Sequence, residues 1–176
     1  YQKWYLDNGQ DGEQHVFEGP FTQYGVTDNW ATVSNGQPNI YQQIYWEMGT
    51  SNGWIGYTYG KDYGYMEFKE DGTFFVHRIA EDGTITDETG TYTVDEQNKT
   101  VTVDIPVIYA NTWIGTKSGT LKILSLTNEG MRIALPADDT YAYALNYYSE
   151  AKRKADERIA VNLVCVDNTW AGTFGA

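Results

Sequence analysis

Tryptophan rings flanked by small polar residues are the side chains of this chain best suited to ligand chemistry. Trp30 stands in a polar stretch, Trp54 lies within Asn-Gly-Trp-Ile-Gly, and Trp113 lies within Asn-Thr-Trp-Ile-Gly. A flat ring covers the apolar face of a sugar while polar groups beside it meet the hydroxyls. Because loops on a rigid scaffold carry function, these residues predict carbohydrate binding by ring stacking.

The same stretches supply further polar rings and amides. Tyr57 and Tyr59 follow Trp54 closely, and Asn52 and Asn111 each stand two residues before a tryptophan. Their hydroxyl and amide groups can donate and accept hydrogen bonds, as a neutral glycan requires. The predicted ligand-binding residues are Trp30, Trp54, Tyr57, Tyr59, Trp113, Asn52 and Asn111. The alternative is structural, since aromatic side chains also fill cores and close barrel ends.

Acidic residues on predicted strands raise a second kind of chemistry. A glycoside hydrolase needs two carboxyl groups roughly 5–9 Å apart across the scissile bond. Glu47, Glu67 and Asp104 are strand-borne acids near aromatic residues. Solvated strand faces explain such residues equally well in an acidic protein. We therefore expect a protein without catalytic residues, and the glycosidase stays an alternative.

One loop partly fits the pattern of a calcium site. Asp7, Asp11 and Glu18 have the spacing of three ligands in a helix–loop–helix calcium loop. Gly9 replaces the second acidic ligand, and no helices flank the segment, so the loop lacks what makes that motif specific. The sequence favours a polar surface loop here and predicts no metal.

Histidine and cysteine chemistry is sparse. His15 and His77 are far apart in the sequence, without the spacing of a metal pair. Cys165 is the only cysteine, which excludes an intrachain disulfide, and it lies in an apolar run typical of a buried thiol. No phosphate-binding or dinucleotide-binding motif is present, so no cofactor is predicted.

Charge and length limit the classes of partner. The 176 residues carry a formal net charge of −12, which argues against nucleic acid and anionic membrane surfaces as partners. The chain contains no apolar run of about 18 residues, so direct membrane insertion is not expected. An aromatic content of 15% together with 18 glycines indicates a strand-rich globular protein.

Short alternating segments separated by turn residues indicate a β meander. Asp71-Gly72 and Asp82-Gly83 have the chemistry of tight hairpin turns. The fold class predicted is all-β, a single antiparallel barrel or sandwich, with a short helix at residues 149–158. The predicted strands span residues 2–7, 63–69, 73–79, 90–95, 100–105, 120–126, 131–135, 141–147 and 159–166.

The first part of the chain has less pattern. Residues 1–43 are irregular after the first strand, and residues 27–39 are expected to form a long polar loop. Trp4 and Trp46 stand in strand-like patterns, so both are expected in the core.

Three stretches together resemble a known family. They read YGYMEFKEDGTFFVHR, GTYTVDEQNKTVTVDI and GTLKILSLTNEGMRIAL, and they are similar to the lipocalin-like domains of Bacteroidetes surface lipoproteins. The opening Lys3-Trp4-Tyr5-Leu6-Asp7 also resembles the start of glycan-binding domains encoded beside starch-utilisation-type outer-membrane transporters. The resemblance covers roughly residues 1–135, and the Lys- and Glu-rich tail after residue 137 departs from the usual short ending.

The resemblance implies a barrel or sandwich of about eight strands on the bacterial cell surface. It implies capture of a poly- or oligosaccharide, an outer-membrane transporter or surface lipoprotein complex as partner, and a secreted or lipid-anchored protein whose anchor lies outside this sequence. We expect one domain over residues 1–176, with the C-terminal part of a larger lipoprotein as the alternative. The expected function is non-catalytic glycan binding, and the alternatives are an interaction module without a small ligand and a glycoside hydrolase.

Overall fold

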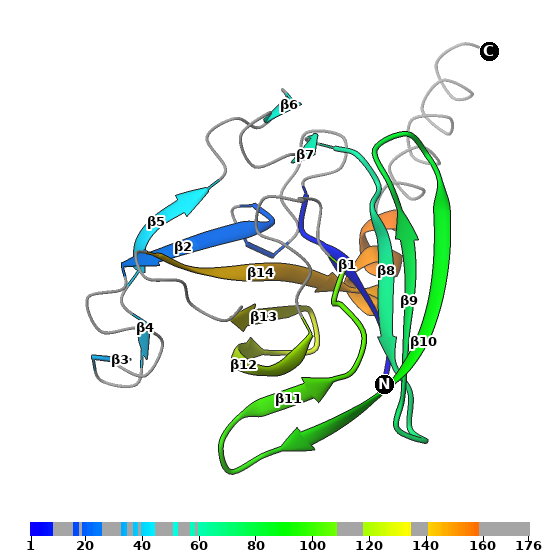
Figure 1. The fold of residues 1–176 in the computed structure, drawn as a ribbon. Helices are drawn as coiled ribbons and strands as arrows, with labels where there is room; N and C mark the ends of the chain where they lie inside the picture. Colours follow the sequence, from blue (N-terminus) through cyan, green and yellow to red (C-terminus); the bar gives the residue numbers. More distant parts are fainter. Residues whose placement is uncertain are drawn as a thin grey trace, which may run out of the picture.

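The main feature of the fold is a curved antiparallel sheet that closes into a barrel (Figure 1). In the computed structural model, the described residues are 1–8, 16–17, 19–25, 33–34, 37–38, 40–44, 51–52, 57–58, 60–108, 118–134 and 141–158. Successive barrel strands are neighbours in the sheet. They are β1 (Lys3–Leu6), β8 (Gly64–Phe68), β9 (Thr73–Ile79), β10 (Ile85–Asp95), β11 (Thr100–Val103), β12 (Gly119–Leu126), β13 (Gly130–Ala134) and β14 (Tyr141–Ser149).

The barrel closes because its first and last strands pair with each other. β14 is hydrogen-bonded to β13 on one side and to β1 on the other, where Tyr5 stands opposite Tyr148 and Leu6 opposite Tyr147. Within the described part of the chain, the result is a closed eight-stranded antiparallel barrel. The all-β prediction is confirmed, and the barrel is the observed form rather than the sandwich.

Two further strands extend the sheet beyond the barrel. β2 (Phe21–Gly25) pairs with the first half of β14, and β5 (Ile40–Ile44) pairs with β2. The prediction that residues 1–43 are irregular after the first strand is therefore wrong. Local pattern could not reveal β2, because its partner is β14, at the opposite end of the sequence.

Two short hairpins lie in the segment between β1 and β8. β3 (Val33–Ser34) pairs with β4 (Gln37–Pro38), and β6 (Ser51–Asn52) pairs with β7 (Tyr57–Thr58). The stretch of residues 27–39, predicted as one long loop, thus contains a hairpin whose two strands have two residues each. Such short ladders have almost no sequence pattern of their own, which explains why they were not predicted.

The predicted Asp-Gly turns are confirmed. Gly72 has a φ of +85°, which costs glycine little, and the Asp71 carboxylate accepts a hydrogen bond of 2.9 Å from the backbone N–H of Thr73. The turn at Asp82 repeats this arrangement, and Gly83 has the same φ of +85°. These local interactions set the register of the hairpins β8–β9 and β9–β10.

The pKa values of several Asp carboxyl groups in and beside the turns are lowered in the folded barrel. The hydroxyl of Thr73, and after it the backbone N–H of the same residue, lowers the pKa of Asp71. Backbone N–H groups of neighbouring residues are the largest cause of the lowered pKa values of Asp82, Asp95 and Asp104. Each carboxyl group therefore prefers its charged form in the folded protein.

We expect the stability of the protein to fall in acid. An Asp carboxyl group whose pKa is lower in the folded protein than in the unfolded chain stabilises the fold at a pH above the usual Asp pKa of 3.8. This stabilisation is lost as the pH falls through the pKa that the group has in the folded protein. Thermal melting followed by circular dichroism between about pH 5 and pH 2.5 measures this loss. The double variant Asp71→Asn and Asp82→Asn keeps acceptor oxygens that cannot titrate, so its melting temperature should depend less on pH. An equally steep pH dependence in the variant would contradict this explanation.

The helix predicted near the C-terminal end is confirmed at residues 150–158. Ser149 caps it, because its hydroxyl accepts a hydrogen bond of 3.1 Å from the backbone N–H of Lys152. Lys152 also forms an ion pair of 2.9 Å with Asp156 one turn later. The strand predicted at residues 159–166 lies outside the described residues.

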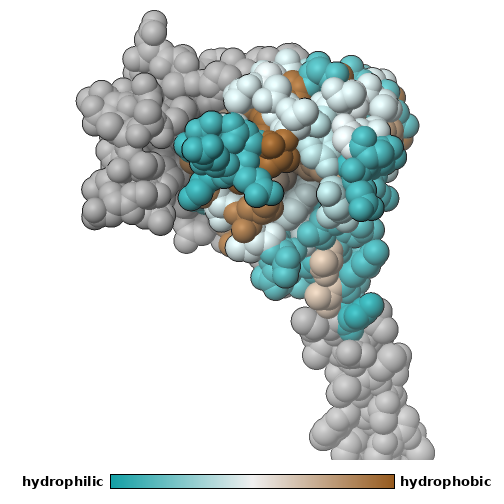
Figure 2. Space-filling model, turned by 90° about the horizontal axis from the view of Figure 1, so that it is seen from below, coloured by the Kyte–Doolittle hydropathy of each residue, from teal (hydrophilic) through white to brown (hydrophobic). Residues whose placement is uncertain are grey.

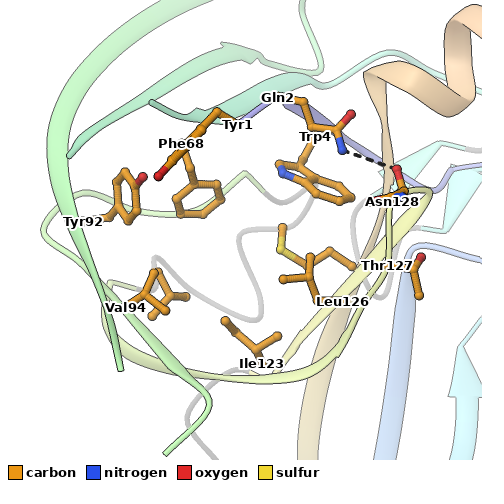
Figure 3. A pocket seen from close by; sticks show the side chains of 12 residues that line it. Tyr1, Gln2, Trp4, Phe68, Tyr92, Val94, Ile123, Leu126, Thr127 and Asn128 are labelled. Atoms are coloured by element: carbon orange, nitrogen blue, oxygen red, sulfur yellow. Dashed lines mark hydrogen bonds between the residues drawn. The ribbon is translucent and has the colours of Figure 1, made fainter. Parts of the chain in front are cut away.

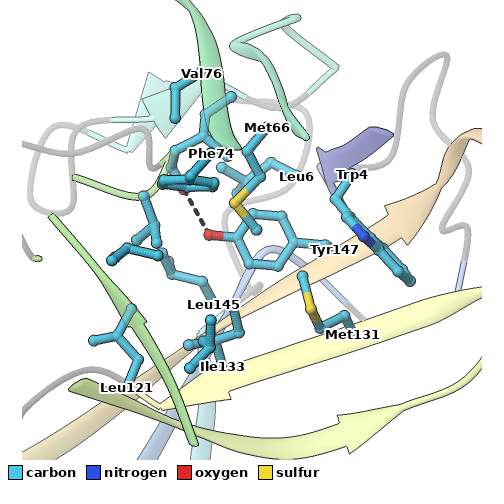
Figure 4. Close-up of a cluster of buried hydrophobic side chains, with 14 of the residues drawn as sticks. Trp4, Leu6, Met66, Phe74, Val76, Leu121, Met131, Ile133, Leu145 and Tyr147 are labelled. Carbon is cyan, nitrogen blue, oxygen red and sulfur yellow. Dashed lines mark hydrogen bonds between the residues drawn. The ribbon is translucent and has the colours of Figure 1, made fainter. Parts of the chain in front are cut away.

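Alternating side chains of the barrel strands fill the interior (Figure 4). Tyr147, Phe74 and Met66 are among the largest fully buried side chains. Trp4 is 6% exposed, so its predicted place in the core is confirmed. Trp46, the other predicted core tryptophan, lies outside the described residues.

Residues after β11 plug one end of the barrel. Val107 and Ile108 are fully buried and belong to the hydrophobic core. The hydroxyl of Tyr147 on β14, three strands away around the barrel, donates a hydrogen bond of 2.7 Å to the carbonyl of Ile108 (Figure 4). Arg78 donates a hydrogen bond of 2.9 Å to the carbonyl of Pro106 at the same end. The chain therefore fills the barrel where β9 ends and β10 begins.

Candidate ligand site at the open barrel end

The end of the barrel opposite this plug contains a pocket of about 380 Å³ (Figure 3). This volume lies within the range of about 300–1,000 Å³ that is typical of small-molecule sites. Side chains from six barrel strands, from the chain start and from the β12–β13 turn form its wall. The lining residues are Tyr1, Gln2, Trp4, Phe68, Tyr92, Val94, Val101, Ile123, Leu126, Thr127, Asn128 and Met131.

Strand alternation directs most of these side chains inward. On β10, Tyr92 and Val94 are separated by two positions, so both face the barrel axis. The same period places Trp4 on β1 and Phe68 on β8 inside. A pocket remains because β8 and β10 end at turns just beyond Phe68 and Val94, so neither strand adds another inward side chain there.

A bulge in β12 brings one more residue into the pocket. Ile123 stands opposite Ile133, but the register then shifts, so that Ser125 stands opposite Arg132 and Leu126 opposite Met131. Without the shift, Leu126 would face away from the barrel. The regular alternation predicted over residues 120–126 is therefore wrong at its end, and the bulge explains why Leu126 lines the pocket.

Aromatic rings on one side of the pocket hold each other in place. Phe68 meets Tyr92 edge to face at 5.0 Å between ring centroids and stacks on Phe74 at 4.8 Å. The Tyr92 hydroxyl donates a hydrogen bond of 2.7 Å to the carbonyl of Lys69, and burial raises the pKa of that hydroxyl. The rings are thus ordered before any ligand arrives, which lowers the entropic cost of binding.

The rim of the pocket combines apolar and polar groups. Val94 and Leu126 are 53% and 58% exposed. Gln2 donates a hydrogen bond of 3.3 Å to the carbonyl of Asn128 across the rim (Figure 3). Figure 2 views the end of the molecule that lies lowest in Figure 1 and shows hydrophobic surface gathered beside strongly hydrophilic surface.

The lining side chains are electrically neutral. None of the twelve lining residues is Lys, Arg, His, Asp or Glu. A charged ligand would lose hydration without gaining an ionic partner from this wall. The pocket therefore suits a neutral molecule.

The predicted ligand-binding residues lie elsewhere or are not described. Asn52 and Tyr57 stand opposite each other in the β6–β7 hairpin, at the other end of the barrel from the pocket (Figure 1). The remaining predicted residues fall outside the described part of the chain. They are Trp30, Trp54, Tyr59, Trp113 and Asn111.

The site residues that the prediction missed belong to the meander itself. Phe68 and Tyr92 are aromatic residues next to hairpin turns, and the sequence pattern predicts only a scaffold role for them. Phe68 is the last residue of its strand, and this position is the signal that could have found it. In a barrel, the last inward side chain beside a turn borders the barrel mouth.

Of the three strand-borne acids considered for a glycoside hydrolase, Asp104 and Glu67 lie within the described residues. The Asp104 carboxylate accepts hydrogen bonds of 2.7 and 3.0 Å from the N–H and hydroxyl of Thr91, which lower its pKa. A general acid needs the opposite shift. Glu67 stands between Lys3 and Phe75 on the neighbouring strands, and Glu47 lies outside the described residues.

Asp7 is a structural residue. It is fully buried, and its Oδ2 atom accepts hydrogen bonds of 2.9 and 2.6 Å from the backbone N–H groups of Val16 and Phe17. The prediction of a polar surface loop is therefore wrong for Asp7. Within the described residues, no group of three His, Cys, Asp or Glu side chains could hold a metal ion. Asp11 and Glu18 lie outside those residues.

A row of rings crosses the outer face of the barrel but has its faces covered. Tyr65 stacks on His77 at 5.2 Å, and Tyr5 lies 5.7 Å from Tyr65 on the other side. The Nζ atom of Lys3 lies 4.5 Å from the centroid of the Tyr65 ring. His77 is also held by Asp87 at 2.6 Å. This row stabilises neighbouring strands and offers a sugar little free ring face.

Comparisons with known proteins show no family for this chain. No protein-family model, curated protein or solved structure matches it. Among the described residues, no helix is long and apolar enough to cross a membrane.

Proposed function

We propose that this protein is a non-catalytic carbohydrate-binding protein that takes a neutral glycan at the open end of its barrel. The observation that supports this function is the uncharged pocket of about 380 Å³ with aromatic walls and a polar rim. A sugar ring has an apolar face and a hydrogen-bonding edge, and both find partners there. Trp4, Phe68 and Tyr92 supply rings, and Gln2 and Asn128 supply amides.

The loop aromatics belong to the same proposal as a second contact surface for a long glycan. The β6–β7 hairpin holds Asn52 opposite Tyr57, and this hairpin surrounds the Trp54 position in the sequence. A location on the bacterial cell surface, beside an outer-membrane transporter, rests on the family resemblance alone. A glycan carrier in that position would deliver its cargo without changing it.

A charged residue at the rim should block binding. We expect Leu126→Arg and Val94→Arg to weaken the binding of a neutral oligosaccharide by about ten-fold or more, because the new guanidinium occupies the mouth and must be desolvated. Both positions are more than half exposed, so folding should be preserved. Isothermal titration calorimetry against a panel of neutral poly- and oligosaccharides measures the effect.

The matched control is Ile85→Arg. Ile85 is 59% exposed, like the rim residues, but it begins β10 at the plugged end of the barrel. Its variant should bind like the wild type. Equal binding by Leu126→Arg and the wild type, or no binding of the panel by the wild type, would contradict the proposed function. The same titration tests the loop surface with the variants Trp30→Ala, Trp54→Ala and Trp113→Ala. If all three variants bind like the wild type, the proposal that the loop aromatics form a second contact surface is wrong.

A further inference from the structure

The pocket changes its chemistry from mouth to base. Polar lining groups gather at the mouth, on Gln2, Thr127 and Asn128, two of which are joined by the Gln2–Asn128 hydrogen bond (Figure 3). Val101 and Met131, which are 2% and 4% exposed, line the inner part and belong to the hydrophobic core. The gradient runs from hydrogen-bonding edge to hydrocarbon base.

A bare sugar does not fit the whole of this gradient. The side chains of Val101 and Ile123 have no N–H or O–H group, and the Tyr92 hydroxyl already donates to the carbonyl of Lys69. A sugar hydroxyl pushed against these residues would exchange hydrogen bonds with water for hydrocarbon contacts, which is unfavourable. The same wall favours an alkyl, acyl or aryl group, whose burial removes apolar surface from water.

Described side chains fill the end of the barrel opposite the pocket. Val107 and Ile108 plug the far end, and the fully buried side chains of Tyr147 and Met66 belong to the same hydrophobic core. A polysaccharide cannot thread through such a barrel. The group that enters must therefore be a terminus or a substituent of the ligand.

We propose that the ligand is a neutral glycoside, or the end of a glycan, whose apolar substituent enters the pocket while its sugar ring stays at the polar mouth. This inference rests on the proposed carbohydrate-binding function and adds the chemical class of the group that is bound. The exposed Val94 and Leu126 side chains extend the apolar wall to the mouth, where the substituent joins the sugar.

The test compares matched probes on the full chain. Isothermal titration calorimetry is run with the methyl and p-nitrophenyl β-glycosides of glucose, galactose and mannose, and with p-nitrophenol alone. We expect the p-nitrophenyl glycoside of the preferred sugar to bind about ten-fold or more tightly than its methyl glycoside, because the aryl ring buries more apolar surface. It should also bind more tightly than p-nitrophenol, because the sugar meets the polar rim.

Ile123→Thr tests where the aryl group lies. This substitution puts a hydroxyl into the pocket wall and should reduce the preference for the aryl glycoside to about three-fold or less. Ile85→Thr, the same exchange at the exposed site on the plugged end, should leave the preference unchanged. Thermal melting shows that both variants are folded.

The possible results separate the two proposals. Equal affinity for methyl and p-nitrophenyl glycosides would overturn the inference about the substituent and leave carbohydrate binding standing. Equal affinity for p-nitrophenol and its glycosides would show that the sugar contributes nothing, and would overturn carbohydrate binding in the pocket. An aryl preference that survives in Ile123→Thr would overturn the placement of the substituent.

Discussion

Gly64→Ala should prevent the barrel from folding stably. Gly64 begins β8 with a φ of +93°, and a Cβ atom there would lie 1.8 Å from the carbonyl oxygen of His77 on the paired strand. That oxygen belongs to the backbone of β9, so relief requires the two strands to separate. We expect a loss of about 4 kcal/mol or more in the free energy of unfolding, measured by urea denaturation.

Gly83→Ala is the matched control for this clash. Gly83 has a similar φ of +85°, but nothing lies within 4 Å of a Cβ atom built on it. Its variant should lose only about 1–2 kcal/mol, the cost of a left-handed conformation without a clash. If the two alanine variants are equally stable, β8 and β9 do not approach each other at Gly64 as the structure describes.

Asp7→Ala should produce the second large loss of stability. The buried Asp7 carboxylate accepts backbone hydrogen bonds from Val16 and Phe17, and the backbone N–H of Asp7 donates to the carbonyl of Asn146 at 2.9 Å. Removing the carboxylate leaves two N–H groups without this acceptor. Because hydrogen bonds to charged groups contribute about 1.5–3 kcal/mol each, we expect a loss of about 3 kcal/mol in the free energy of unfolding.

Asp62→Ala is the control for Asp7. The Asp62 carboxylate also accepts a backbone hydrogen bond, of 2.8 Å from Gly64, but the residue is exposed and water can replace the acceptor. Urea denaturation should show a loss of about 1 kcal/mol or less. If Asp7→Ala costs no more than Asp62→Ala, Asp7 does not fasten residues 16–17 to the end of β1.

The meander could be predicted because its signals are local. Asp71-Gly72 and Asp82-Gly83 specify tight turns within a few residues, and period-2 alternation specifies the strands beside them. β10 was predicted only from residue 90, because its first residues are exposed and give no alternation. Its pairing with β9, where Ile85 stands opposite Ile79, extends the strand to its observed start.

Closure and the bulge could not be predicted in the same way. The pairing of Tyr5 with Tyr148 joins residues at opposite ends of the sequence, and β2 depends on β14 in the same manner. The register shift after Ile123 changes which face Leu126 occupies, although the residue types still suggest regular alternation. Such features depend on packing across the barrel rather than on neighbouring residues.

The candidate site was missed because ligand chemistry was assigned to tryptophans in loops. Trp4 was correctly predicted as a core residue, yet it also forms part of the pocket wall. Phe68 and Tyr92 gave the ordinary signal of strand aromatics. Only the closed barrel, plugged at one end by Val107 and Ile108, shows that the inward residues at the other end surround open space.

The most direct test of carbohydrate binding at the open end is chemical-shift mapping by nuclear magnetic resonance. ¹⁵N-labelled protein is titrated with the neutral oligosaccharide that binds most tightly in the calorimetric panel. The largest shift changes should occur at Gln2, Val94, Leu126 and Asn128, around the pocket mouth. Saturable changes confined to residues away from the pocket, such as Tyr65 and His77 on the outer face, would contradict binding at the open barrel end.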